Sequence, residues 1–114
     1  MHMSDRIKQA FADLREARTA LHAASEKELE AKEDLKDYEC TLLLSVMPDG
    51  GLRINGKNAD QREAQIRSET YDERSVLEKA RQEKVKAQLA MDLAVMKCDE
   101  LKWIIRAEFN ELAD

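Results

Sequence analysis

The stretch "PDGGLRINGKNA", residues 48–59, decides the fold, because it is the only part of the chain in which a helix could not comfortably run. Pro48 lacks an amide donor and pushes the residue before it away from helical geometry. Gly50, Gly51 and Gly56 tolerate the positive φ values that tight turns need. We therefore expect a turn over residues 48–57, at which the chain reverses.

The composition indicates that the segments on both sides of this turn are helices. Of the 114 residues, 38% are charged and 4% are aromatic, and the chain contains three glycines and one proline. Such a chain is typical of long helices and coiled coils. We predict an all-α fold with one domain over residues 4–114, in which a helix over 4–47 and a helix over 58–113 flank the turn. Residues 1–3 are interpreted as an expression scar.

A heptad pattern supports the first helix. Leucine and isoleucine recur every seven residues from Ile7 to Leu42, interrupted by Glu28, and alanines follow a companion ladder three residues further on. The second helix has a start signal at Asn58, whose side chain can accept hydrogen bonds from the free amides of the first turn. Gln61, three residues later, completes the capping-box pattern. From Leu77 onward the second helix repeats the pattern, so both helices present a seam in which large layers alternate with alanine layers. Its large-residue ladder is Leu77, Lys84, Met91, Cys98, Ile105 and Leu112, with Ala80, Ala87, Ala94 and Leu101 on the companion ladder.

The periodicity fades between residues 68 and 75 of the second helix. Thr70 and Glu73 have the spacing of another capping box, so a break here is the alternative to a continuous helix. Because this stretch contains neither glycine nor proline, we expect the helix to continue through it.

A hairpin that reverses near residue 52 or 53 pairs residues whose numbers sum to about 105. Small residues of the two ladders then face one another and let the helices approach closely. The predicted seam consists of Ala10, Ala17, Ala24, Ala80, Ala87 and Ala94. Alanines bury little surface, so this seam cannot carry the stability alone.

In this register the end of the second helix overhangs the first. We predict that its apolar residues form an oligomer interface, because large exposed apolar patches usually mark interaction sites. They are Leu101, Trp103, Ile104, Ile105, Phe109 and Leu112. The simplest assembly is a two-fold dimer with four helices, although a higher homo-oligomer satisfies the same pattern. In the alternative, the N-terminal segment folds back and covers the patch.

Residues with the spacing needed for chemistry are scarce. His22 is the only histidine outside the scar, no Glu-x-x-His stands in the sequence, and the hairpin separates Cys40 from Cys98. The glycines before Asn58 could cradle a phosphate, but they lack the spacing of a P-loop, and we interpret them as a structural turn. We predict no enzymatic activity, no catalytic or metal-binding residues, and no cofactor.

Charge is distributed unevenly. Residues 26–39 hold seven acids against three lysines, and residues 79–86 hold Lys79, Arg81, Lys84 and Lys86 against one acid. Solvated helix faces are the plain interpretation of both stretches. The basic stretch is the candidate for nucleic-acid contact, and the acidic stretch could imitate nucleic-acid charge. No apolar run approaches the ~20 residues that cross a bilayer, so we expect no membrane association.

A loop that ends in Gly-Lys-Asn-Ala and continues x-x-Arg-x-Ala-x-Ile resembles small helical proteins of phage and prophage genomes, mostly of unassigned function. The matching residues are Gly56, Lys57, Asn58, Ala59, Arg62, Ala64 and Ile66. Such proteins often accompany phage recombination genes, and the resemblance implies a bacterial host cytoplasm. It implies no catalytic residues.

Two functions are compatible with these features. The first is a self-associating helical protein of phage type that binds an unidentified protein partner, as a scaffold or as an inhibitor of a host or defence protein. The alternative is an accessory that binds single-stranded nucleic acid beside a recombinase through the basic stretch.

Overall fold

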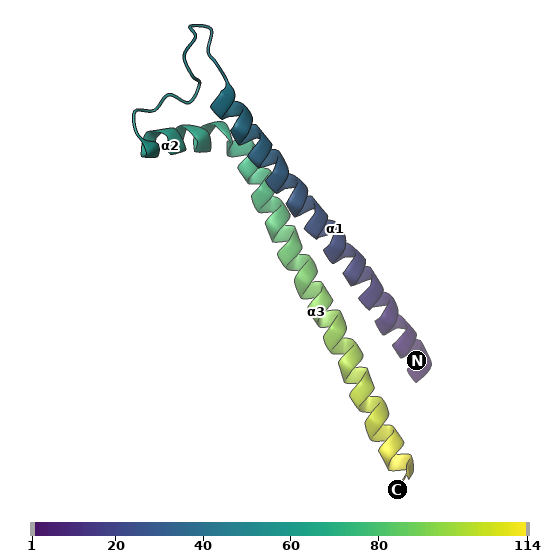
Figure 1. The fold of residues 1–114 in the computed structure, drawn as a ribbon. Coiled ribbons are helices and arrows are strands. Elements are labelled where there is room, and N and C mark those ends of the chain that lie inside the picture. Colours follow the sequence, from purple (N-terminus) through teal and green to yellow (C-terminus); the bar gives the residue numbers. More distant parts are fainter. Residues whose placement is uncertain (1, 114) are drawn as a thin grey trace. The chain divides into compact units, whose positions relative to one another are not determined.

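A computed structural model describes residues 2–113, and the side chains of residues 2–111. It contains three helices: α1 over Met3–Leu44, α2 over Ala59–Glu69 and α3 over Tyr71–Ala113 (Figure 1). Within this part of the chain the β-pairing amounts to an isolated bridge between Val46 and Leu52. The predicted all-α class is confirmed.

Contacts divide the chain into two compact units. Unit 1 combines Met1–Ser25 with Glu83–Asp114, and unit 2 is Glu26–Gln82. Each unit therefore joins part of α1 to part of α3, and unit 2 also contains α2 and the loop before it.

The observed helix α1 differs from the predicted helix over 4–47 at both ends, because it starts one residue earlier and ends three residues earlier. The structure begins α1 at Met3, where the amides of Asp5 and Arg6 both donate to the carbonyl of His2. The helix ends at Leu44, three residues before the expected end. The reason is that Ser45 and Met47 use their backbone groups to pair with Arg53 and Gly51 across the loop.

The loop after α1 is a short hairpin. The amide of Gly50 donates to the carbonyl of Met47 at 2.9 Å, with Pro48 at the second position of this turn. Gly50 has φ +88° and follows the turn as the left-handed residue of a bulged hairpin. Pro48 thus stabilises the tip of the hairpin, and the helix has already ended when the chain reaches it.

The same loop is fastened to α2 by side chains. Asn58 caps this helix by accepting from the Gln61 amide at 2.9 Å, as expected. The Gln65 side chain accepts from the amides of Asn55 and Gly56, at 3.1 and 2.8 Å. Arg62 donates to the Gly56 carbonyl at 3.1 Å. These bonds hold the loop backbone against the first two turns of the helix.

The prediction of one continuous helix over 58–113 is wrong, because Thr70 interrupts it between α2 and α3. Its side chain is fully buried, and its hydroxyl donates to the Ile66 carbonyl at 2.7 Å while accepting from Arg74 Nε at 2.9 Å. A threonine hydroxyl that bonds back to the fourth residue before it often bends a helix. Thr70 therefore marks a bend, and the capping box with Glu73 does not form at its hydroxyl.

In unit 2, α1 and α3 pack through residues of the heptad ladders, in a register that differs from the predicted one. Ala31, Leu77 and Ala80 form a buried cluster, with Leu35 packed against it. Glu39 of α1 accepts from Arg74 of α3 at 3.1 Å, so the bend at Thr70 is also tied to α1. Leu42 and Ile54 are buried as well, at 1% and 5% exposure. The loop thus contributes Ile54 to the apolar interior.

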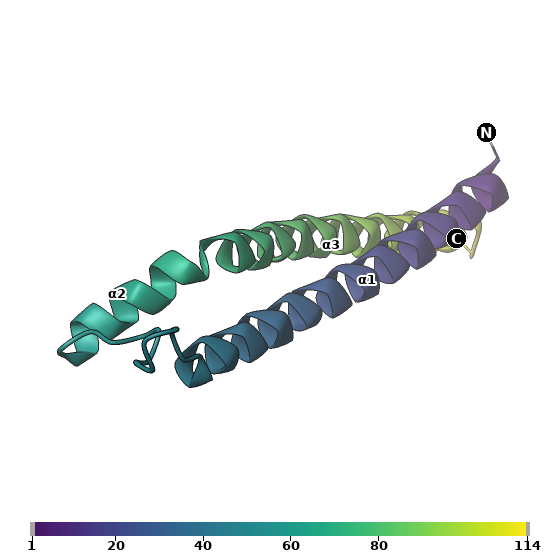
Figure 2. The same ribbon diagram turned by 90° about the horizontal axis from the view of Figure 1, so that it is seen from above.

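In unit 1 the two helix segments lie side by side and run in opposite directions (Figures 1 and 2). The Cys98 thiol of α3 contacts the Ala10 carbonyl of α1, and residues of both helices line a shared surface depression beside this contact. Ala10 and Ala24 are buried, and Ala17, Ala87 and Ala94 are half-buried. Together with Ala80 in unit 2, all six alanines predicted for the seam are thus at least half-buried.

Candidate functional site: an apolar groove in unit 1

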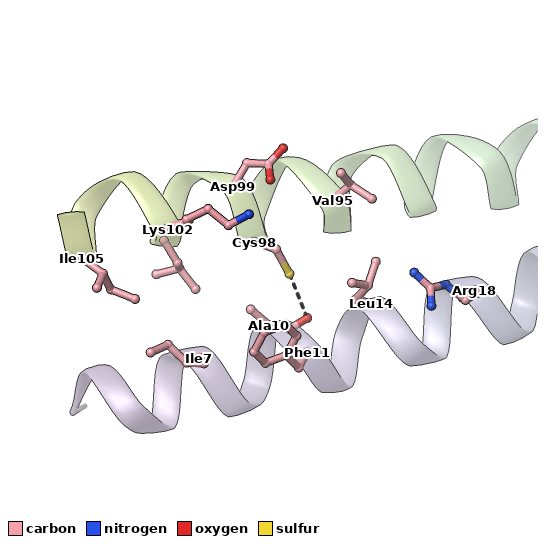
Figure 3. Close-up of a pocket in the computed structure, with 11 residues that line it drawn as sticks. Ile7, Ala10, Phe11, Leu14, Arg18, Val95, Cys98, Asp99, Lys102 and Ile105 are labelled. Atoms are coloured by element: carbon pink, nitrogen blue, oxygen red, sulfur yellow. Dashed lines mark hydrogen bonds between the residues drawn. The ribbon is translucent and has the colours of Figure 1, made fainter. Parts of the chain in front are cut away.

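A groove of about 560 Å³ runs along one side of the seam in unit 1 (Figure 3). Both helices line it, and most of its surface is apolar. From α1 come Ile7, Ala10, Phe11, Leu14 and Arg18, and from α3 come Val95, Cys98, Asp99, Leu101, Lys102 and Ile105. Clefts of this size, apolar with a few polar groups, are typical of binding sites.

The floor of the groove consists of seam residues. The Cys98 thiol points across it and donates to the Ala10 carbonyl at 3.7 Å (Figure 3). Leu101 is only 3% exposed. Its predicted place in a free overhang is therefore wrong: Cys98 contacts Ala10, so Leu101, one turn further along α3, lies beside the α1 turn that holds Ile7 and is buried within the same unit.

The walls of the groove are apolar side chains that remain open to solvent. Phe11 is 50% exposed, and Val95 and Ile105 are each 39% exposed. Phe11 and Val95 occupy the heptad position next to the seam, so two helices alone cannot cover them. They require a further layer of protein to be buried.

Three charged residues stand at the rim, and they carry both signs. Arg18 lies at one end of the groove, and Asp99 and Lys102 lie toward the other (Figure 3). Because the rim carries both positive and negative charges, two copies of this surface do not repel one another as strongly as two rims of a single charge would.

The remaining residues of the predicted oligomer interface have different environments. Ile104 is half-buried, whereas Trp103 and Phe109 are 68% and 69% exposed. The Arg106 guanidinium lies 5.5 Å from the centre of the Trp103 ring, a cation–π contact. The side chain of Leu112 lies outside the described residues.

Phe11 and Val95 were not among the predicted interface residues. The signal was available, because each follows an isoleucine or a methionine of the large-residue ladder by four residues. An apolar residue at that spacing adds a third apolar position to each heptad. The apolar face of the helix then becomes as wide as in helices that pack against more than one neighbour. A second missed feature is a row on the outer side of α3, where Leu89, Met96 and Trp103 recur every seven residues and are all more than half exposed.

The basic residues proposed for nucleic-acid contact do not form one exposed set. Lys79, Arg81 and Lys86 are exposed, whereas Lys84 occupies a seam position and is half-buried. In the acidic stretch, Glu39 bonds Arg74 and Glu28 accepts from Lys32 at 3.0 Å. Part of each charged stretch therefore serves to hold the helices.

Two other features, a metal-binding cluster and a membrane-spanning helix, were looked for in residues 2–113. No cluster of three or more histidine, cysteine or acidic residues that could hold a metal ion is formed by them. None of the helices in that range combines the length and the apolar character required to span a membrane. Cys40 and Cys98 are both free thiols.

Comparison of this chain with models of protein families, with curated proteins and with solved structures found no match.

Proposed function

We propose that this chain is a non-enzymatic helical protein that acts through protein–protein interaction, and that its first partner is a second copy of itself. The observation that supports the proposal is the groove of unit 1, whose walls include the exposed side chains of Phe11, Val95 and Ile105. Each large apolar side chain that becomes fully buried contributes about 1.5–3 kcal/mol. These side chains are partly buried already, so a dimer gains only the exposed part of that contribution from each, against the free-energy cost of association.

A dimer built on this surface has four helices in two layers, the arrangement of a helical bundle. It fits a protein that serves as a scaffold or that binds and inhibits a host or defence protein. Binding of single-stranded nucleic acid through the basic stretch is less well supported, because Lys84 is directed into the seam and exposed aromatic side chains do not alternate with the remaining cations.

The proposal is tested by sedimentation equilibrium of the unmodified chain across the micromolar range. We expect a concentration-dependent dimer. Ile105→Glu should shift it to monomer, because the new carboxylate would be buried in the apolar groove of the dimer. Leu29→Glu is the matched control, since Leu29 is 58% exposed and lies in unit 2.

Monomer at every concentration would contradict the proposal. A gel shift with single-stranded DNA at low salt, performed on the same preparation, examines the alternative. Binding that is lost on changing Lys79 and Arg81 to glutamate would favour the nucleic-acid function over ours.

A further inference from the structure

We propose that the second copy docks groove to groove, with α1 of one copy lying antiparallel on α3 of its partner, around a two-fold axis that runs parallel to the helices. This inference rests on the proposed function and adds the surface, the pairing of helices and the charges that select it. Three observations within unit 1 support it.

The first observation is a row of basic residues on α1 beside the groove. Lys8 and Arg15 are exposed and are seven residues apart, which places them on one line about 10.5 Å apart. Lys8 precedes Phe11 by three residues and Arg15 follows it by four, so both flank the exposed ring on the same helix face.

The second observation is an acidic row with the same spacing on α3. Asp92 and Asp99 are exposed, are also seven residues apart, and flank Val95 in the same way. Each helix therefore carries an apolar side chain toward the groove and a pair of like charges at its outer edge. The charges of the two helices are opposite.

The third observation is that these rows lie at matching levels along unit 1. Ala10 lies near the level of Cys98, because the Cys98 thiol donates to the Ala10 carbonyl. Counting in opposite directions from there, Phe11 lies near the level of Val95. In the same way Lys8 lies near the level of Asp99, and Arg15 near that of Asp92.

A rotation about an axis parallel to the helices keeps these levels and exchanges the helices. Phe11 then meets the partner's Val95, while Lys8 and Arg15 meet the partner's Asp99 and Asp92. A two-fold axis perpendicular to the helices would instead stack α1 on α1 and place basic row against basic row. Like charges opposite one another cost several kcal/mol across an interface. The charges therefore select the arrangement in which α1 lies on α3.

The area of this face is adequate for a dimer. The α1 segment of unit 1, from Met3 to Ser25, is about 35 Å long, and two adjacent helices are about 20 Å wide. The face thus measures about 700 Å², close to the ~800 Å² that each partner buries in a standard interface.

A charge exchange tests the pairing, with the dissociation constant measured by sedimentation. Lys8→Glu with Arg15→Glu should weaken the dimer at least about tenfold, and Asp92→Lys with Asp99→Lys should do the same. The chain that carries all four changes should dimerise within a few-fold of the unmodified chain, because every pair is restored with reversed sign. Lys86→Glu with Lys97→Glu is the matched control on α3, since neither lysine lines the groove.

The outcomes separate the two proposals. Absence of a dimer in the unmodified chain would overturn the proposed function itself. If the dimer tolerates both charge reversals, or if the chain with all four substitutions does not regain dimerisation, self-association still holds but this arrangement is overturned. A dimer that is lost instead on Met96→Glu, and kept on the charge reversals, would assign the interface to the outer row of α3. Helix content by circular dichroism confirms that each variant is folded.

Discussion

At the scale of single residues, Gly56 lies where the loop backbone comes closest to α2. A Cβ atom at this position would lie 2.7 Å from the Arg62 amide nitrogen and 2.8 Å from the Gln61 carbonyl carbon. Because both are backbone atoms, the loop has to move away. This movement strains the bond that the Gly56 amide donates to Gln65 and the bond that Arg62 donates to the Gly56 carbonyl. Gly56→Ala should lower the free energy of unfolding by about 1–3 kcal/mol in a urea titration.

Gly51→Ala provides the comparison for that change. The nearest atom to a Cβ at Gly51 is the Asp49 carboxylate oxygen at 3.2 Å. It belongs to a side chain that can turn aside, with the loss of one exposed hydrogen bond from the Gly51 amide. Equal losses of stability in the two variants would show that the close contact with the α2 backbone at Gly56 does not cause the loss.

Thr70 yields a second prediction at this scale. Thr70→Val keeps the shape but removes the hydroxyl that joins Ile66 to Arg74, and we expect a loss of about 1 kcal/mol in thermal unfolding. Thr19→Val removes the same type of bond, to Arg15 at 2.9 Å, from an exposed site and should change little. A stability loss no larger at Thr70 than at Thr19 would argue against a structural role for the buried hydroxyl.

Several residue-scale features could be predicted from the sequence, and others could not. The Asn58 cap depends on neighbours within three residues, and a local pattern is enough to find it. The role of Thr70 depends on burial and on Arg74, which Glu39 of another helix holds in place. The fading periodicity over residues 68–75 marked this stretch as the place of an alternative break, but the absence of glycine and proline favoured a continuous helix.

At the scale of helices, the seam can be tested by overfilling it. Ala87 is half-buried on the side of α3 that faces α1 in unit 1. Ala87→Leu adds three carbon atoms between closely spaced helices and should cost about 1–3 kcal/mol. Ala90→Leu makes the same change at an exposed position one turn away and should stay within about 0.5 kcal/mol. An unchanged melting temperature for both variants would mean that Ala87 faces water.

The heptad periodicity predicted which side of each helix is buried, because this pattern reflects helix geometry alone. Helix ends were less predictable. Pro48 was expected to stop α1, yet the helix ends earlier because residues 45–47 pair with residues 51–53. That pairing is decided by the loop as a whole, so no single helix-breaking residue reports it.

At the scale of the whole molecule, the sequence correctly indicated unburied apolar surface but placed it too narrowly. The expected overhang included Leu101, which is buried, and omitted Phe11 and Val95, which are not. Apolar residues at two positions of each heptad are enough to pack two helices together. An apolar residue at a third position, such as Phe11 or Val95, is buried only when the pair packs against another layer. The groove is formed by both helices of unit 1 together, so the pattern of one helix alone does not predict it.

Self-association through this groove is tested most directly by the two native thiols. Cys98 lines the groove and Cys40 is exposed in unit 2, so each chain carries a probe and its own control. The alkylation rate of each thiol is measured by mass spectrometry as the protein concentration rises through the micromolar range. We predict that Cys98 becomes progressively slower to react while Cys40 keeps its rate. A Cys98 rate that is independent of concentration, in parallel with Cys40, would contradict docking at the groove.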